Sequence, residues 1–228
     1  MNEQYKVQVQ NLVDDLKAVF THAGLGGEAG EYKLLTQSFL YKFLNDKFLY
    51  EAQDVDSENT YDRLVSMSEE DYDWLLEDIG TSTAWMKPNQ FIETLHRKQN
   101  ESDFYETFEN TLNQIAIDNN DIFSVHTDGD TAIRLFDERL ITDTISDSSK
   151  RNEVAKAIIN LLARVKFDET IFSQGFDFFS TLFEYMIKDY NKDGGVKYAE
   201  YYTPHSVAKI IADILVGNDQ PSNVRIYD

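Results

Sequence analysis

The sequence contains no cysteine, only three prolines and no long uninterrupted apolar run. The lack of cysteine excludes disulfides, thiolate zinc sites and cysteine nucleophiles. A membrane-spanning helix needs about 18 or more apolar residues in succession, and no such stretch is present. The N-terminal residues MNEQYK also lack the basic and apolar regions of a secretory signal. We therefore expect a cytoplasmic protein with no membrane partner.

Basic residues are scarce, with 21 Lys and Arg against 41 Asp and Glu, which gives a net charge of −20. Residues 51–147 hold 6 basic and 24 acidic side chains, whereas the two flanking segments carry a net charge of −1 each. Phosphate binding needs positive charge, so a nucleic-acid footprint over the whole surface is excluded. The acidic segment is either a solvated face or a surface for a basic partner, and the sequence leaves both open.

No catalytic or metal-ligating group stands out among the remaining residue types. The four histidines show no paired spacing of the kind that metal sites use, and they are His22, His96, His126 and His205. We therefore predict neither a metal site built on histidine nor a catalytic residue.

Helical periodicity dominates the chain, and residues 31–51 are apolar on most sides, which predicts a central buried helix. Ser68 with Asp71 predicts an N-terminal cap, Pro88 predicts the first turn of a helix through Leu95, and Ser102 predicts a further cap. Residues 119–148 are polar and predict a loop with short elements. The other predicted elements are helices over 9–20, 68–79, 102–115, 154–165, 178–190 and 203–215 and a strand over 224–228.

The segment from Asp189 to Glu200 matches the calcium-loop pattern D-x-[DN]-x-[DN]-G-x5-E. Pro204 opposes a calcium site, because it would break the exiting helix at a cost of ~3 kcal/mol or more. A second interpretation places Thr203 as N-cap and Pro204 in the first turn of a helix that starts there. Its free backbone N–H groups would then suit a carboxylate or phosphate, beside the aromatic rings of Tyr201 and Tyr202.

These residues resemble a known family. Gly194-Gly195, then Glu200-Tyr-Tyr-Thr-Pro-His205, an apolar helix and a strand ending in Asp228 resemble part of the modification (M) subunit of type I restriction-modification systems. Glu31-Tyr32-Lys33 near the N-terminus is similar to a further family segment. Two departures are four additional residues, 196–199, and His205 in place of the usual Arg.

The resemblance implies methyl transfer from S-adenosylmethionine to the exocyclic amino group of adenine in DNA, with the base flipped out of the duplex. It also implies that one short stretch and one later residue contact the cofactor: Glu200, Tyr201, Tyr202, Thr203, Pro204, His205 and Asp228. The Gly-rich loop that would follow Asp228 and the Asn-Pro-Pro-Phe segment of the family are not in this sequence. We therefore expect residues 1–228 alone to be inactive and to bind the cofactor weakly or not at all.

The resemblance also implies a mainly α fold. A helical N-terminal domain over 1–168 would precede the truncated start of an α/β methyltransferase domain over 169–228, with its helices and first strand. The implied partners are a specificity (S) subunit, a second M subunit, a restriction (R) subunit and double-stranded DNA. Two alternatives remain, an acidic helical calcium-binding protein with its loop at 189–200, and an interaction module whose acidic residues dock on a basic partner.

Overall fold

The computed structural model describes residues 3–120, 125–126, 132–167, 169–173, 203 and 205–216. The chain divides into two compact units, Met1–Phe176 and Asp177–Asp228. The described residues are mainly helical, which confirms the predicted fold class. The predicted helix over 178–190 and the predicted strand over 224–228 lie outside the described residues, and the predicted domain boundary at 168/169 stays a prediction.

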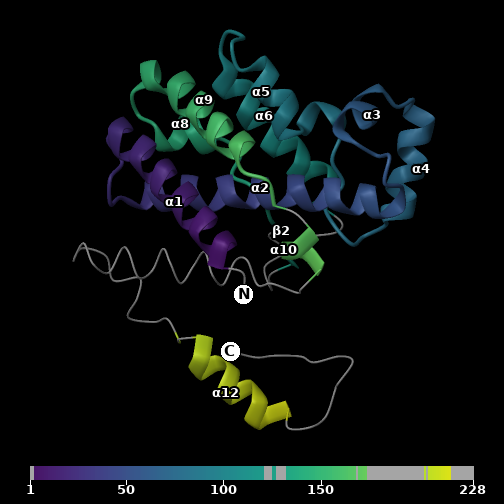
Figure 1. The fold of residues 1–228 in the computed structure, drawn as a ribbon. Helices are drawn as coiled ribbons and strands as arrows, with labels where there is room; N and C mark the ends of the chain where they lie inside the picture. The colour runs from purple at the N-terminus through teal and green to yellow at the C-terminus, as the bar shows by residue number, and fades with distance from the viewer. Residues whose placement is uncertain are drawn as a thin grey trace. The chain divides into compact units, whose positions relative to one another are not determined.

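The first unit is built from helices of very different length (Figure 1). Its two long N-terminal helices are α1 (Glu3–Ala23) and α2 (Ala29–Val55). The later elements are α3 (Tyr61–Ser66), α4 (Glu69–Ile79), the 3₁₀ turn η1 (Pro88–Gln90), α5 (Ile92–Lys98), α6 (Phe104–Asp118), α8 (Leu140–Thr144), α9 (Ser148–Arg164) and α10 (Glu169–Ser173). A short antiparallel pair, β1 (Val125–His126) and β2 (Ala132–Ile133), aligns Val125 with Ile133. The loop with short elements predicted for 119–148 is thus confirmed for the described residues of that segment, which contain β1, β2 and α8 (Leu140–Thr144).

Helix α2 is the centre of the first unit, as its apolar sequence predicts. It packs against α1, α4, α8, α9 and α10, so most of its circumference faces other helices (Figure 1). Phe39, Phe48 and Leu35 on α2 are completely buried. Helix α9 packs against α1, α5 and α6. The hydrophobic core therefore lies between α2 and the helices that surround it.

Glu31, one of the residues that carry the family resemblance, has a structural role in the turn between α1 and α2. Glu31 is buried, and its carboxylate accepts a hydrogen bond from the backbone N–H of Gly27 at 2.7 Å. Gly27 has φ +76, a left-handed conformation that favours glycine. Glu31 therefore stabilises the turn that reverses the chain into α2.

Two of the three predicted helix starts in the middle of the chain are wrong. Ser68 does cap α4, since its hydroxyl accepts from the backbone N–H of Asp71 at 3.1 Å. Pro88, however, begins only the turn η1, because extended backbone at Phe91 separates it from α5. Ser102 does not cap α6: the N-cap is Asp103, and the donor at Tyr105 is satisfied by Asn152 of α9 at 3.0 Å.

Candidate functional site

The second unit contains the residues that the sequence analysis places at the cofactor. The structure describes Thr203, which is exposed and precedes the helix, and the backbone of His205, the first residue of α12 (His205–Val216). Glu200, Tyr201, Tyr202, Pro204 and Asp228 lie outside the described residues, as does the calcium-like loop 189–200. The predicted helix after Thr203 is confirmed.

Helix α12 presents free backbone donors and the positive end of its dipole at its N-terminus. It is 12 residues long, and the N–H groups of its first turn have no partner within an α-helix. The macrodipole adds about half a positive charge at that end. Its apolar side chains are exposed, namely Val207, Ile210, Ile211, Ile214 and Leu215. The free N–H groups and the dipole at this end of the helix favour a negatively charged group such as a carboxylate.

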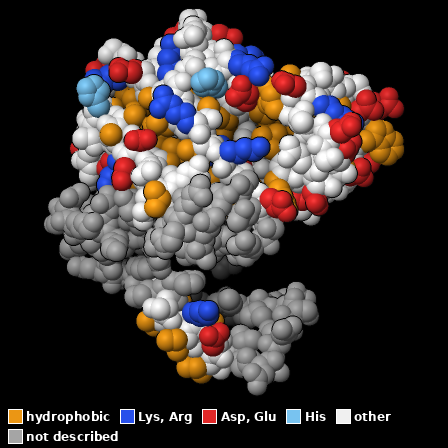
Figure 2. All heavy atoms as spheres, viewed as in Figure 1, with side chains coloured by type: hydrophobic (Ala, Val, Ile, Leu, Met, Phe, Trp, Pro, Cys, Tyr) orange, Lys and Arg blue, Asp and Glu red, His pale blue; other side chains and the backbone are white. Residues whose placement is uncertain are grey.

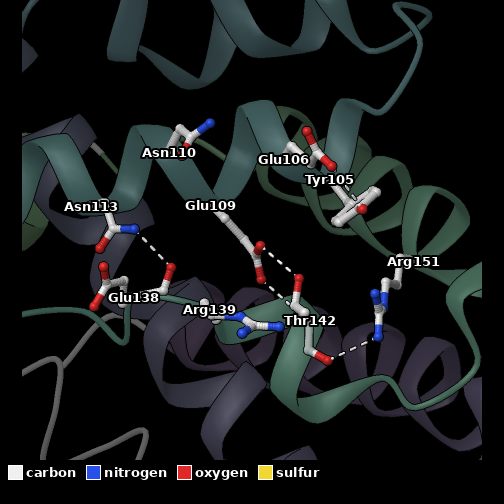
Figure 3. Close-up of a pocket in the computed structure, with 9 residues that line it drawn as sticks. All are labelled: Tyr105, Glu106, Glu109, Asn110, Asn113, Glu138, Arg139, Thr142 and Arg151. Atoms are coloured by element: carbon white, nitrogen blue, oxygen red, sulfur yellow. Dashed lines mark hydrogen bonds between the residues drawn. The ribbon is translucent and has the colours of Figure 1, made fainter.

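In the first unit, one polar cavity of about 450 Å³ lies between α6, α8 and α9 (Figure 3). Glu109 of α6 points at the start of α8, where its carboxylate accepts from the Thr142 backbone N–H at 2.6 Å and from its hydroxyl at 2.9 Å. Arg151 of α9 donates to the carbonyls of Ile145 and Thr142 at 3.0 and 3.1 Å. These hydrogen bonds attach the five-residue helix α8 to α6 and α9, so the residues that line the cavity have a structural role.

Glu109→Ala should lower the free energy of unfolding by about 1–3 kcal/mol, because two donors of Thr142 would lose their buried acceptor. Urea titration of the purified chain measures this change. Glu106→Ala is the matched control, since Glu106 lines the same cavity but is exposed. Its expected effect is within about 0.5 kcal/mol. Equal losses in the two variants would contradict the role given to Glu109.

A second cavity, about 540 Å³, lies beside the segment that links α9 to α10. Its wall contains a buried polar cluster on α2. Lys42 pairs with Asp46 at 2.9 Å, and the Asp46 carboxylate also accepts from the Asn45 amide at 2.8 Å and from the backbone N–H of Phe167 at 2.7 Å. Asn45 in turn accepts from the backbone N–H of Ile92 at 2.9 Å.

Each residue of this polar cluster (Lys42, Asn45 and Asp46) has an ion-pair or hydrogen-bond partner within the protein. Burial lowers the pKa of Lys42, and the carboxylate of Asp46 opposes that shift. The sequence analysis missed these three residues, although polar side chains at positions 42, 45 and 46 of a predicted buried helix were a visible signal. Their bonds connect α2 to α5 and to Phe167, which makes them anchors for the chain.

A metal centre finds no support in the part of the chain that the structure describes. That part contains no group of three or more His, Asp or Glu side chains arranged to hold a metal ion. The calcium-like loop is not tested by this search for metal-binding groups, because its residues are outside the described ranges.

No helix among the described residues is both long and apolar enough to cross a membrane.

Two comparisons with known proteins found a match, one for the sequence of the C-terminal segment and one for the fold of nearly the whole chain. Residues 174–228 match the family model described as N-6 DNA Methylase. The fold is similar to the crystal structure of a type I restriction-modification system methyltransferase subunit from Streptococcus thermophilus, with a TM-score of 0.61 and 21% identity. That match covers 95% of this chain and 44% of the other, so this chain spans less than half of that subunit's length. No match was found among the curated proteins.

The two matches differ in kind. One is a match of sequence over the segment that contains Thr203 and α12, and the other is a match of fold over nearly the whole chain. The family model agrees with the DNA methylase resemblance that the motifs around Glu200–His205 carry, and the second match shows a similar fold. The resemblance of this chain to the modification subunits of type I restriction-modification systems is thereby confirmed.

Proposed function

We propose that this chain is part of a DNA adenine methyltransferase, the modification subunit of a type I restriction-modification system. The observation that carries the proposal is the match of residues 174–228 to the N-6 DNA Methylase family. This segment includes every residue predicted to contact the cofactor. The methyl group would come from S-adenosylmethionine and would be transferred to the exocyclic amino group of adenine.

The cofactor is proposed to lie against the start of α12. Thr203 precedes this helix, and the free N–H groups of its first turn would meet the methionine carboxylate. Tyr201 and Tyr202 would supply aromatic surface, and Glu200, Pro204 and Asp228 complete the proposed contact set. His205 stands where the family has an Arg, so an anion contact there would be weaker than in relatives.

The proposed domain division assigns residues 1–168 to a helical domain and 169–228 to the start of the methyltransferase domain. The working assembly would be cytoplasmic and would contain an S subunit, a second M subunit, an R subunit and double-stranded DNA. Residues 51–147 carry most of the negative charge, so we place DNA away from this segment.

Cofactor binding by the subunit encoded by the complete gene tests the proposed contact residues. Isothermal titration with S-adenosylmethionine should give a dissociation constant that rises by about tenfold or more in Tyr202→Ala, which corresponds to ~1.4 kcal/mol. His205→Arg should tighten binding, because a guanidinium is always charged and binds carboxylates in a bidentate manner. The matched control is Lys209→Ala, one turn further along α12 and exposed. Unchanged binding in Tyr202→Ala would contradict the proposed contact set.

A further inference from the structure

A groove of about 520 Å³ lies between the end of α2, α3 and α4 in the first unit. Its walls combine apolar and acidic side chains. Trp74 of α4 lines it and is 63% exposed, and the lining residue Val55 is exposed as well. A tryptophan this exposed is unusual, since Trp is highly buried on average in soluble proteins. Trp74 is therefore not part of the hydrophobic core of the first unit.

The charge around Trp74 is almost entirely of one sign. Helix α4 has six acidic residues and no basic residue within its 11 positions: Glu69, Glu70, Asp71, Asp73, Glu77 and Asp78. Figure 2 shows acidic side chains gathered around a protruding hydrophobic one in the region of α4. The basic residue in the groove, Arg63, is already paired with Asp56 at 3.0 Å and with Glu58 at 3.2 Å. The groove therefore offers a strongly negative surface around an aromatic ring.

The groove also holds an unpaired buried acceptor. Asn59 lines it and is only 3% exposed. The Asn59 amide nitrogen donates to the carbonyl of Ala52 at 2.9 Å, while its Oδ1 has no hydrogen-bond partner among the residues that the structure describes. A buried acceptor without a donor costs free energy. Asn59 therefore leaves one hydrogen-bonding group unsatisfied beside the groove.

We propose that this groove, the α3–α4 groove, binds a basic segment of a partner protein through an arginine side chain stacked on Trp74. Trp is the aromatic side chain with the strongest cation–π interaction, and arginine makes this contact more often than lysine. The carboxylates of α4 would attract and orient the guanidinium, whose N–H groups match carboxylate geometry. A DNA backbone would be repelled by the same charges. The proposal does not depend on the methyltransferase assignment.

Fluorescence anisotropy with labelled oligoarginine as the probe tests the groove on the intact chain. We expect saturable binding that weakens with salt. Trp74→Ala should weaken it about three- to fivefold, and Trp74→Phe should recover part of that loss, as cation–π contacts of an exposed ring predict. Labelled oligolysine should bind more weakly than oligoarginine. Equal binding of the two peptides, or no effect of Trp74→Ala, would overturn the proposal.

A pair of charge variants separates a specific groove from general attraction to an acidic protein. The triple variant Asp73→Asn, Glu77→Gln, Asp78→Asn removes three exposed charges beside Trp74. The control Glu28→Gln, Glu101→Gln, Glu153→Gln removes three exposed charges elsewhere. The first should weaken binding about tenfold or more and the second less than about twofold, because screening limits the reach of remote charges to about 10 Å. Equal effects of the two triples would show nonspecific attraction and overturn the proposal.

Discussion

Asp46→Ala should lower the free energy of unfolding by about 3–5 kcal/mol, one of the two largest losses expected from a single substitution in this chain. Asp46 and Lys42 are only 5% and 4% exposed, and they form an ion pair inside the first unit. Removal of the carboxylate would leave the Lys42 ammonium buried without a counterion. It would also leave the backbone N–H of Phe167 without its acceptor. Urea denaturation followed by circular dichroism measures the change.

Two further variants show where this loss comes from. Lys42→Met with Asp46→Ala should be less destabilised than Asp46→Ala alone, since no buried charge is left unpaired. Recovery should be incomplete, because the Phe167 N–H still lacks an acceptor. Glu138→Ala breaks an exposed ion pair with Arg134 and should cost less than about 1 kcal/mol. A loss below 1 kcal/mol in Asp46→Ala would contradict the anchoring role of the polar cluster.

Phe48→Ala should have a similar effect, a loss of about 3–5 kcal/mol. Phe48 is completely buried at the middle of the core, and its ring lies 5.7 Å from that of Phe91 and 6.4 Å from that of Tyr72. Truncation would remove these contacts and leave a cavity between α2, α4 and the segment before α5. Thermal and urea unfolding of the variant measure the loss.

The controls for Phe48 vary the size and the burial of the side chain that is changed. Phe48→Leu keeps most of the volume and should cost less than about 1.5 kcal/mol. Trp74→Ala removes a larger side chain, but one that is mostly exposed, and should change stability by no more than about 0.5 kcal/mol. A loss for Trp74→Ala equal to that for Phe48→Ala would mean that Trp74 belongs to the core.

The sequence predicted those helices whose signals are local. The apolar periods of α1 and α9 reflect burial of one helix face, and the apolar sequence of α2 reflects its burial by several helices. The Ser68 cap of α4 uses a donor three residues away. The errors at Ser102 and Pro88 have a different cause. The first turn of α6 is satisfied by Asn152 and that of α5 by Asn45, which are both 47 residues distant in sequence. A rule that considers only neighbouring residues cannot find such caps.

For the candidate site, the sequence rules predicted the local helix start but not which ligand or which polar partners the residues have. The helix after Thr203 follows from capping and proline rules, and the structure confirms α12. The assignment of Glu200–His205 to a cofactor, however, came from a resemblance of motifs, because Tyr-Tyr-Thr-Pro by itself fits an ordinary capped helix. The polar cluster on α2 was missed since its partners, Ile92 and Phe167, become neighbours only after folding. Periodicity describes which face is buried, but it does not describe which polar groups meet there.

Transfer of labelled methyl groups from S-adenosylmethionine to DNA tests the central claim most directly. The subunit encoded by the complete gene, assembled with its specificity subunit, should place the label on the exocyclic amino group of adenine. Residues 1–228 alone should transfer none, because they lack the Asn-Pro-Pro-Phe segment. Label on cytosine, or no transfer by the assembled subunits, would contradict the account. Transfer by residues 1–228 alone would contradict the proposed need for the segment that this sequence lacks.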